Sequence, residues 1–195
     1  MLSRLFRKPK PHPTFITAHL NCRLTPNDRE HVFGDPLNDA LKKAGLGEVS
    51  GGGSLMSPEG EIIHIDLELM LNELTETALD LAIKVLNSRQ APKGSWLHLD
   101  DGTVLHEFGN SEVLGLYLDG VSLPAEVYEA FDTDAFLDDV LAALDGAGRF
   151  QGDHVMRTHT ALFFVGDDFH AMRTRLSPLV EKTPICQNAR IEQIA

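Results

Sequence analysis

The chain is poor in cysteine and in basic residues, and it contains no long apolar run. Its two cysteines, Cys22 and Cys186, are too few for a disulfide scaffold and form no CxxC pair, so we expect a reducing, cytoplasmic setting. No window approaches the roughly 18 consecutive apolar residues of a membrane span, and the basic start of the chain lacks the apolar segment of a secretory signal. The sequence therefore predicts no membrane span.

The basic residues are also unevenly distributed. Lys and Arg number 17 against 29 acidic residues, and four of the 17 lie in residues 1–13, which contain no acidic residue. We expect residues 1–13 to form a basic flexible tail, and the rest of the chain is more acidic than its net charge of −12 indicates. Such a surface repels phosphate backbones, so we expect no nucleic-acid partner. A basic partner protein fits this charge better.

The glycine run in SGGGS, residues 50–54, is the most motif-like string. A phosphate-binding loop needs a Gly-x4-Gly-Lys-Ser/Thr pattern between a strand and a helix. Here no lysine follows, a predicted helix precedes the run, and a predicted hairpin comes after it. We therefore expect a β-bulge or a bare strand edge and exclude a nucleotide site. The absence of a GxSxG elbow also argues against a serine hydrolase.

Hydrophobic periodicity predicts a similar series of elements in each half of the chain. Alternation of apolar and polar residues predicts strands, and apolar spacings of three and four predict helices. In the first half we predict a strand at 15–24, a helix at 34–45, strands at 47–56 and 61–70, a helix at 74–90, and a hairpin at 95–109. In the second half we predict a strand at 113–123, a helix at 132–146, a hairpin at 148–167, a helix at 167–182, and a strand at 186–195.

This order, strand–helix–strand–strand–helix–strand, is that of the ferredoxin-like βαββαβ unit. We therefore predict an α+β fold built by tandem duplication of this unit, with antiparallel sheets that carry helices on one face. The predicted domains are residues 14–109, with an extra hairpin strand, and residues 110–195. Leu37 and Leu137 occupy matching positions in the first helices of the two halves. The extra segment 123–131 is predicted to form a helical turn or a lid.

The open face of the first predicted sheet gathers histidines and carboxylates. His19 alternates outward on the first strand, His64 and Asp66 on the third, and Trp96 and His98 on the fourth. Imidazole and carboxylate groups are ligands for zinc and similar divalent ions. His19, His64, Asp66 and His98 are therefore candidate metal ligands, although a solvated polar face without a metal explains the same pattern.

The second half suggests an interface. Its hairpin strand is apolar on both sides, with Phe163 on one face and Phe164 on the other, which is typical of a strand covered twice. We expect the second sheet to be buried against the first unit or against another chain, and a homodimer is the expected oligomer. Four acidic residues lie near the start of the helix at 132–146, where the helix dipole favours negative charge. The same residues also suit contact with a basic partner protein. The candidate interface residues are Asp132, Asp134, Asp138, Asp139, Phe164 and Trp96.

No catalytic signature is present, so no catalytic residue and no obligatory cofactor is assigned. The leading hypothesis is a non-catalytic cytoplasmic binding or regulatory protein that acts through a protein interface, for instance as an acidic immunity-like or inhibitor partner of a basic protein. The first alternative is a metal-binding protein or metal-dependent enzyme. The order of elements is also similar to that of ACT-type regulatory modules, and this resemblance implies a further alternative, regulation by a small ligand.

Overall fold

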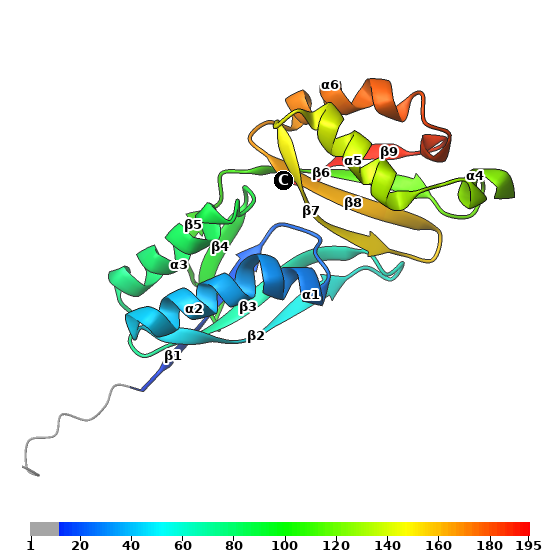
Figure 1. Cartoon of the computed structure of the whole chain (residues 1–195). Coiled ribbons are helices and arrows are strands. Elements are labelled where there is room, and N and C mark those ends of the chain that lie inside the picture. The colour runs from blue at the N-terminus through cyan, green and yellow to red at the C-terminus, as the bar shows by residue number, and fades with distance from the viewer. Residues whose placement is uncertain (1–11) are drawn as a thin grey trace, which may run out of the picture.

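The computed structural model describes residues 12–195, so most of the predicted basic tail, residues 1–11, lies outside the described part (Figure 1). The first half begins with strand β1 (Thr14–Leu20), and a helical stretch made of α1 (Pro26–Arg29), a π-helical turn (Glu30–Gly34) and α2 (Asp35–Ala44) follows. The remaining elements of this half are β2 (Gly47–Met56), β3 (Ile62–Leu71), α3 (Glu76–Ser88), β4 (Ser95–Leu99) and β5 (Val104–Phe108).

The second half repeats the series. It contains β6 (Glu112–Asp119), α4 (Ala125–Glu129), α5 (Thr133–Leu144), β7 (Gly148–Val155), β8 (His159–Gly166), α6 (Phe169–Val180), a 3-10 turn (Pro184–Cys186) and β9 (Arg190–Gln193). Segment 123–131, predicted to be a helical turn or a lid, contains α4. No helix within the described residues combines the length and the apolar composition needed to cross a membrane.

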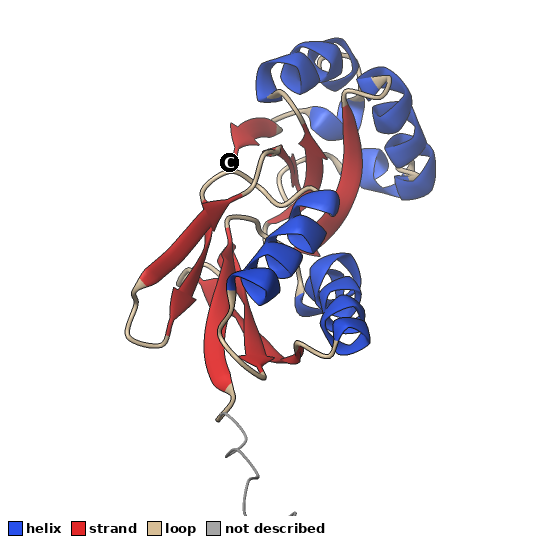
Figure 2. Ribbon diagram, turned by 90° about the vertical axis from the view of Figure 1, so that its left-hand side faces the viewer, coloured by secondary structure: helices blue, strands red, loops and turns tan. Residues whose placement is uncertain are grey.

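Two antiparallel sheets organise these elements. The strand order is β2-β3-β1-β4-β5 in the first sheet and β7-β8-β6-β9 in the second. Leaving β5 aside, both orders are those of a ferredoxin-like sheet, in which the first and third strands are central neighbours. The predicted α+β fold with a duplicated ferredoxin-like unit is therefore confirmed, and the helices of each unit lie on one side of its sheet (Figure 2).

The first helix differs from the prediction. Asp35 and Pro36 are predicted to begin it, but the helical stretch already starts at Pro26. Its N-cap is Thr25, whose side chain accepts a hydrogen bond from the Asp28 backbone N–H. Pro26 occupies the first turn of α1, where its missing N–H costs nothing. Pro36 is then the second residue of α2, within its first turn, where the missing backbone N–H of proline is tolerated. The end was predicted correctly, since Gly45 closes the helix with a left-handed φ of 68°.

Each unit has its own core between sheet and helices. In the first core the inward side chains of β1 and β3, such as Leu20 and Leu67, pack with Phe33 and Leu41 and are fully buried. In the second core Leu116 and Phe164 pack with Val140 and Met172 from the two long helices. Burial of this many apolar side chains is the main term that stabilises both units.

The second sheet is buried on its other face as well. Val113, Tyr117, Phe163 and Val165 point away from the helices, yet they are at most 2 % exposed. The second sheet lies across the end of the first unit, above the segment that follows β1 and the β2–β3 hairpin (Figure 1). Burial of this sheet was predicted, and it occurs within one chain. The two-sided apolar pattern therefore gives no support to a homodimer.

The glycine run lies in an edge strand. β2 pairs only with β3, and a register shift between Val49 and Gly51 marks the expected β-bulge. A Cβ on Gly52 would lie 2.5 Å from the Asp66 carbonyl oxygen and 3.1 Å from Arg29 Cζ of α1. In the second unit, a Cβ on Gly152 would lie 2.9 Å from Asp28 Oδ2. Helix α1 therefore approaches glycines of two edge strands, one in each unit.

Candidate functional site

The predicted polar face of the first sheet brings three of its candidate residues together. The antiparallel register of β1 and β3 places His19 directly opposite Asp66, and His64 lies two residues before Asp66 on the same face. His19 Nδ1 donates a hydrogen bond to Asp66 Oδ1 over 3.1 Å, and His64 Nε2 lies 3.7 Å from Asp66 Oδ2. The two imidazole rings have centroids 4.3 Å apart.

An aromatic side chain fixes one of these imidazoles. Trp96 of β4 pairs with His19 across the sheet, and its ring stacks on the His19 ring with centroids 3.8 Å apart and planes 18° apart. The side chain of His19 is consequently only 11 % exposed. One face of the ring of Trp96, which is a predicted interface residue, is thus covered by an intramolecular contact with His19.

The fourth candidate ligand, His98, lies outside the cluster. It pairs with Thr17 across the sheet and shares the open face, but its Nδ1 donates to the backbone carbonyl of Leu99 over 2.9 Å. The ligand atoms that lie within 4.8 Å of one another come from His19, His64 and Asp66 only, among the residues that the structure describes. His98 acts on this group through its charge, which helps to lower the pKa of Asp66.

The electrostatics favour an ionised Asp66 and a neutral His64. Burial alone would raise the pKa of Asp66, but the hydrogen bond from His19 and the charges of the neighbouring histidines outweigh it, so this pKa is lowered. Burial and the charge of His19 lower the pKa of His64, and Asp66 opposes this only in part. At neutral pH Asp66 is therefore a carboxylate and His64 a neutral imidazole, the forms with lone pairs free for a cation.

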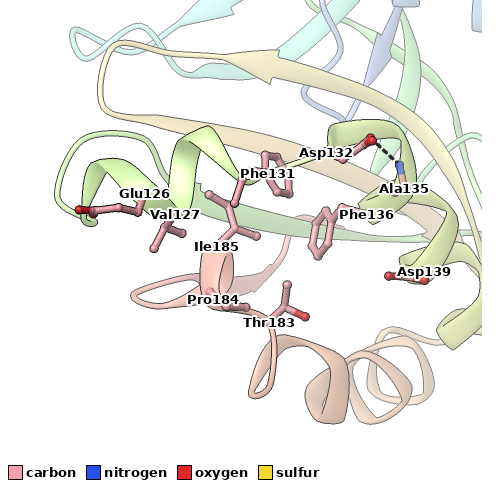
Figure 3. A pocket seen from close by; sticks show the side chains of 11 residues that line it. Glu126, Val127, Phe131, Asp132, Ala135, Phe136, Asp139, Thr183, Pro184 and Ile185 are labelled. Atoms are coloured by element: carbon pink, nitrogen blue, oxygen red, sulfur yellow. Dashed lines mark hydrogen bonds between the residues drawn. The ribbon is translucent and has the colours of Figure 1, made fainter.

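A second candidate region lies on the helical side of the second unit. A pocket of about 410 Å³ is enclosed by α4, the start of α5 and the 3-10 turn (Figure 3), and another of about 420 Å³ lies between α4, α5 and the sheet. The two pockets share Phe131 and Ile185, so they are neighbours. Their floors are apolar, with Val127 and Phe136 in the first and Leu137 and Phe150 in the second.

Both pockets have acidic rims. The acidic lining residues are Glu126, Asp132 and Asp139 in the first pocket and Asp119, Asp134 and Asp153 in the second. No Lys, Arg or His of the described residues lines either pocket. The whole stretch between Lys93 and Arg149 contains neither Lys nor Arg, so α4 and α5 bring no basic side chain to the two pockets.

The acidic interface candidates have different roles. Asp132 is the N-cap of α5, because its Oδ1 accepts a hydrogen bond from the Ala135 backbone N–H over 3.0 Å (Figure 3). Asp134, Asp138 and Asp139 are exposed. Phe164, in contrast, is fully buried between β8 and the helices. It was an interface candidate because both sides of its strand are apolar, but its side belongs to the core of the second unit.

Sequence reasoning missed a charged network where the two units meet. Glu61, which precedes β3, accepts from Arg190 over 3.0 Å and contacts His159 Nε2 at 3.1 Å, while Arg190 lies over the Tyr117 ring at 4.1 Å. Arg23 donates to the Tyr117 hydroxyl. These residues are 38 to 129 positions apart from Glu61, so no local pattern could have grouped them.

Comparisons with known proteins identify no family for this chain. No family model and no curated protein matches the sequence. Solved structures with a similar arrangement include the regulatory subunit of aspartate kinase from Thermus thermophilus, with 13% identity, 85% of this chain and 92% of that chain covered, and a TM-score of 0.29. A proposed monooxygenase from Lactobacillus acidophilus NCFM has 11% identity, coverages of 94% and 93%, and a TM-score of 0.35. Likenesses at this level carry no information on function.

Proposed function

We propose that the chain is a non-catalytic binding protein that docks a basic partner protein on the acidic, pocketed surface around α4 and α5. The observation that carries this proposal is the pair of neighbouring apolar pockets whose rims hold six acidic residues and no basic one. Apolar floors supply the contact area that binding needs, and the charged rim selects the sign of the partner.

The chemistry of the partner follows from these two features. Apolar side chains on the partner would enter the pockets, and Lys or Arg side chains around them would face Asp134, Asp138 and Asp139. Rim charges of this kind accelerate association and exclude acidic competitors more than they add affinity. An immunity-like or inhibitor role toward a basic protein is the specific form of this function. The two buried free cysteines support the predicted reducing, cytoplasmic setting.

A peptide probe tests the proposal directly. The probe is an amphipathic helical peptide with Leu on one face and Lys on the other, and its counterpart carries Glu in place of Lys. We expect the Lys peptide to bind, with an affinity that falls as salt rises, and the Glu peptide not to bind. Fluorescence anisotropy of labelled peptide against the full chain gives both dissociation constants.

Matched variants separate local from global charge. The triple variant Asp134→Asn, Asp138→Asn and Asp139→Asn removes three exposed charges of α5 and leaves the Asp132 cap intact. Asp134 and Asp139 line the pockets, and Asp138 precedes Asp139 on the same helix. At about 0.5 kcal/mol for each exposed charge, the affinity should fall about tenfold. The control triple variant Glu59→Gln, Glu73→Gln and Asp80→Asn changes the net charge equally, but these exposed residues lie in the first unit.

The control triple variant should keep the affinity of the unmodified chain. Equal losses in both triple variants would mean that only net charge matters, and no loss in either would contradict the proposal outright. Val127→Ser removes apolar surface from the first pocket without changing charge, and it should also weaken binding. If Val127→Ser leaves the dissociation constant of the Lys peptide unchanged, the peptide is held by charge alone, which contradicts the proposed binding mode.

A second candidate function, small-ligand regulation, is favoured by a smaller polar pocket of the second unit, which lies beside the Glu61 network. It has a volume of about 230 Å³, and its polar lining residues include Asp119, Ser122, His159, Asn188 and Arg190. The donor groups of Arg190 and Asn188 beside the Asp119 carboxylate suit a small zwitterion such as an amino acid. Thermal unfolding with a panel of such acids tests it, because a ligand of the folded state must raise the midpoint. Arg190→Gln should abolish any such shift.

A further inference from the structure

The cluster of His19, His64 and Asp66 has the composition of a transition-metal site. Two imidazoles and one carboxylate form a donor set that suits zinc and the neighbouring divalent metals, whereas Mg²⁺ and Ca²⁺ prefer oxygen ligands alone. The three residues come from the two central strands of the first sheet, β1 and β3. Rigid strands hold ligand positions more accurately than loops do.

The distances are close to those of a loaded site. One ligand atom from each residue lies within 4.8 Å of the other two. Ligand atoms bound at about 2.0–2.2 Å in tetrahedral geometry lie roughly 3.3–3.6 Å from one another. His19 Nδ1 lies 3.1 Å from Asp66 Oδ1, and His64 Nε2 lies 3.7 Å from Asp66 Oδ2, so each imidazole is already near this range from one carboxylate oxygen. Binding through His19 Nδ1 would replace the proton that this nitrogen now shares with Asp66. The remaining separation, between the two imidazoles, can shorten by rotation of the His64 side chain, which is 24 % exposed and has room to move.

The surroundings of the cluster are also suitable. Trp96 stacks on His19 and restricts the orientation of its ring. Asp66 pairs with no Lys or Arg among residues 12–195, and its side-chain partners there are the two histidines. A bound cation would neutralise the negative charge of the partly buried Asp66 carboxylate, whose close partners are imidazoles. The exposed side of the cluster leaves a coordination position for water.

We propose that His19, His64 and Asp66 bind a divalent transition-metal ion of the zinc class, with at least one coordination position open to solvent. This site lies on the first sheet, whereas the proposed docking surface belongs to the helices of the second unit. Each proposal can therefore fail without the other. The same donor set accepts Fe²⁺ and Co²⁺, and the identity of the preferred ion is a result of the test.

The test uses the full chain after removal of metals with a chelator. Zn²⁺, Co²⁺, anaerobic Fe²⁺ and Mg²⁺ are titrated separately, and binding is followed by calorimetry and by tryptophan fluorescence. Trp96 is the only tryptophan of the chain and stacks on a proposed ligand, so its emission should change as the site fills. We expect one transition-metal ion per chain and no response to Mg²⁺.

Variants decide where the ion binds. His64→Asn and Asp66→Asn each remove one ligand from an exposed sheet face, and each should weaken binding more than about 100-fold, since loss of second-shell partners alone costs 10–100-fold. The control is His106→Asn. His106 Nε2 lies 3.3 Å from Glu76 Oε2, so it is also a histidine–carboxylate pair, but it lies outside the cluster.

His106→Asn should leave the dissociation constant and the fluorescence change as they are. Unfolding midpoints measured without metal show whether each variant is folded. The proposal is overturned if folded His64→Asn and Asp66→Asn chains bind Zn²⁺ like the unmodified chain, because the ion would then be held elsewhere. It is also overturned if the unmodified chain binds none of the transition metals at 0.1 mM, a roughly tenfold excess over a 10 μM site as judged by mass action.

Discussion

The glycine run of β2 offers a sharp test, because two adjacent glycines should respond differently to the same substitution. A Cβ on Gly52 would lie 2.5 Å from the Asp66 carbonyl oxygen and 3.1 Å from Arg29 Cζ, whereas a Cβ on Gly53 would meet nothing within 4 Å. Neither glycine has a positive φ. Neither position therefore needs glycine for its backbone conformation, and the positions differ in the space available for a side chain.

The magnitude follows from the atoms that would clash. Arg29 can move its guanidinium, but the Asp66 carbonyl belongs to the paired strand and cannot rotate away. Gly52→Ala must therefore separate β2 from β3 locally. Overpacking costs about 1–3 kcal/mol, and a strained ladder hydrogen bond adds about 1 kcal/mol, so we expect a loss of about 2–4 kcal/mol. Gly53→Ala should be neutral or stabilise by about 0.4–1 kcal/mol, because alanine restricts the unfolded chain.

Urea unfolding followed by tryptophan fluorescence measures both variants, and Trp96 reports on the unit that contains the glycines. A loss of about 2 kcal/mol lowers the thermal midpoint by about 4–8 °C for a protein of this size. If the free energies of unfolding of the two variants differ by less than about 0.5 kcal/mol, the close approach of Asp66 and Arg29 is not the reason for glycine at position 52.

Three further predictions concern charged groups. Backbone N–H groups of Val121 and Ser122 donate to Asp119 and lower its pKa to about 2, so the stability that this carboxylate contributes is complete above its ordinary value of 3.8 and is lost as the pH falls through about 2; acid unfolding of Asp119→Asn should depend less on pH in this window. Glu61→Gln should lower the free energy of unfolding by about 1 kcal/mol at low salt, and by less at 1 M NaCl, because its partners Arg190 and His159 are partly exposed. Asp168→Ala should cost about 1 kcal/mol in urea unfolding, since its side chain caps α6; a loss below about 0.3 kcal/mol would show that the cap contributes little.

Local patterns were sufficient for most of the fold. Alternation in β1 and β3 and the spacing of apolar residues in α3 and α5 predicted these elements, because side-chain periodicity is a property of neighbouring residues. The start of the first long helix was predicted wrongly because two start signals compete there, and the strands predicted at 15–24 and 186–195 are shorter in the structure, Thr14–Leu20 and Arg190–Gln193. Thr25-Pro26 and Asp35-Pro36 both read as a cap followed by proline, and only the packing of Phe33 into the core makes the intervening turn helical.

The sequence predicted four candidate metal ligands, and the structure brings three of them together. His19, His64 and Asp66 share a face because strand alternation requires it, and this much was visible from the sequence. Their separation depends on the register of β1 against β3, which is set by core contacts far apart in the chain. His98 lies on the same face of the sheet, but its imidazole donates a hydrogen bond to the Leu99 carbonyl of its own strand. No sequence signal distinguishes it from the other three candidates.

The sequence by itself determined the order of elements, the duplication and the acidic character of the helices in the second unit. Tertiary structure alone decided which apolar face is covered. The outward face of the second sheet could have been an interface between chains, and it is buried within one chain because the end of the first unit and the Glu61 network close over it. Such burial depends on the relative placement of two units, which periodicity within either unit does not encode.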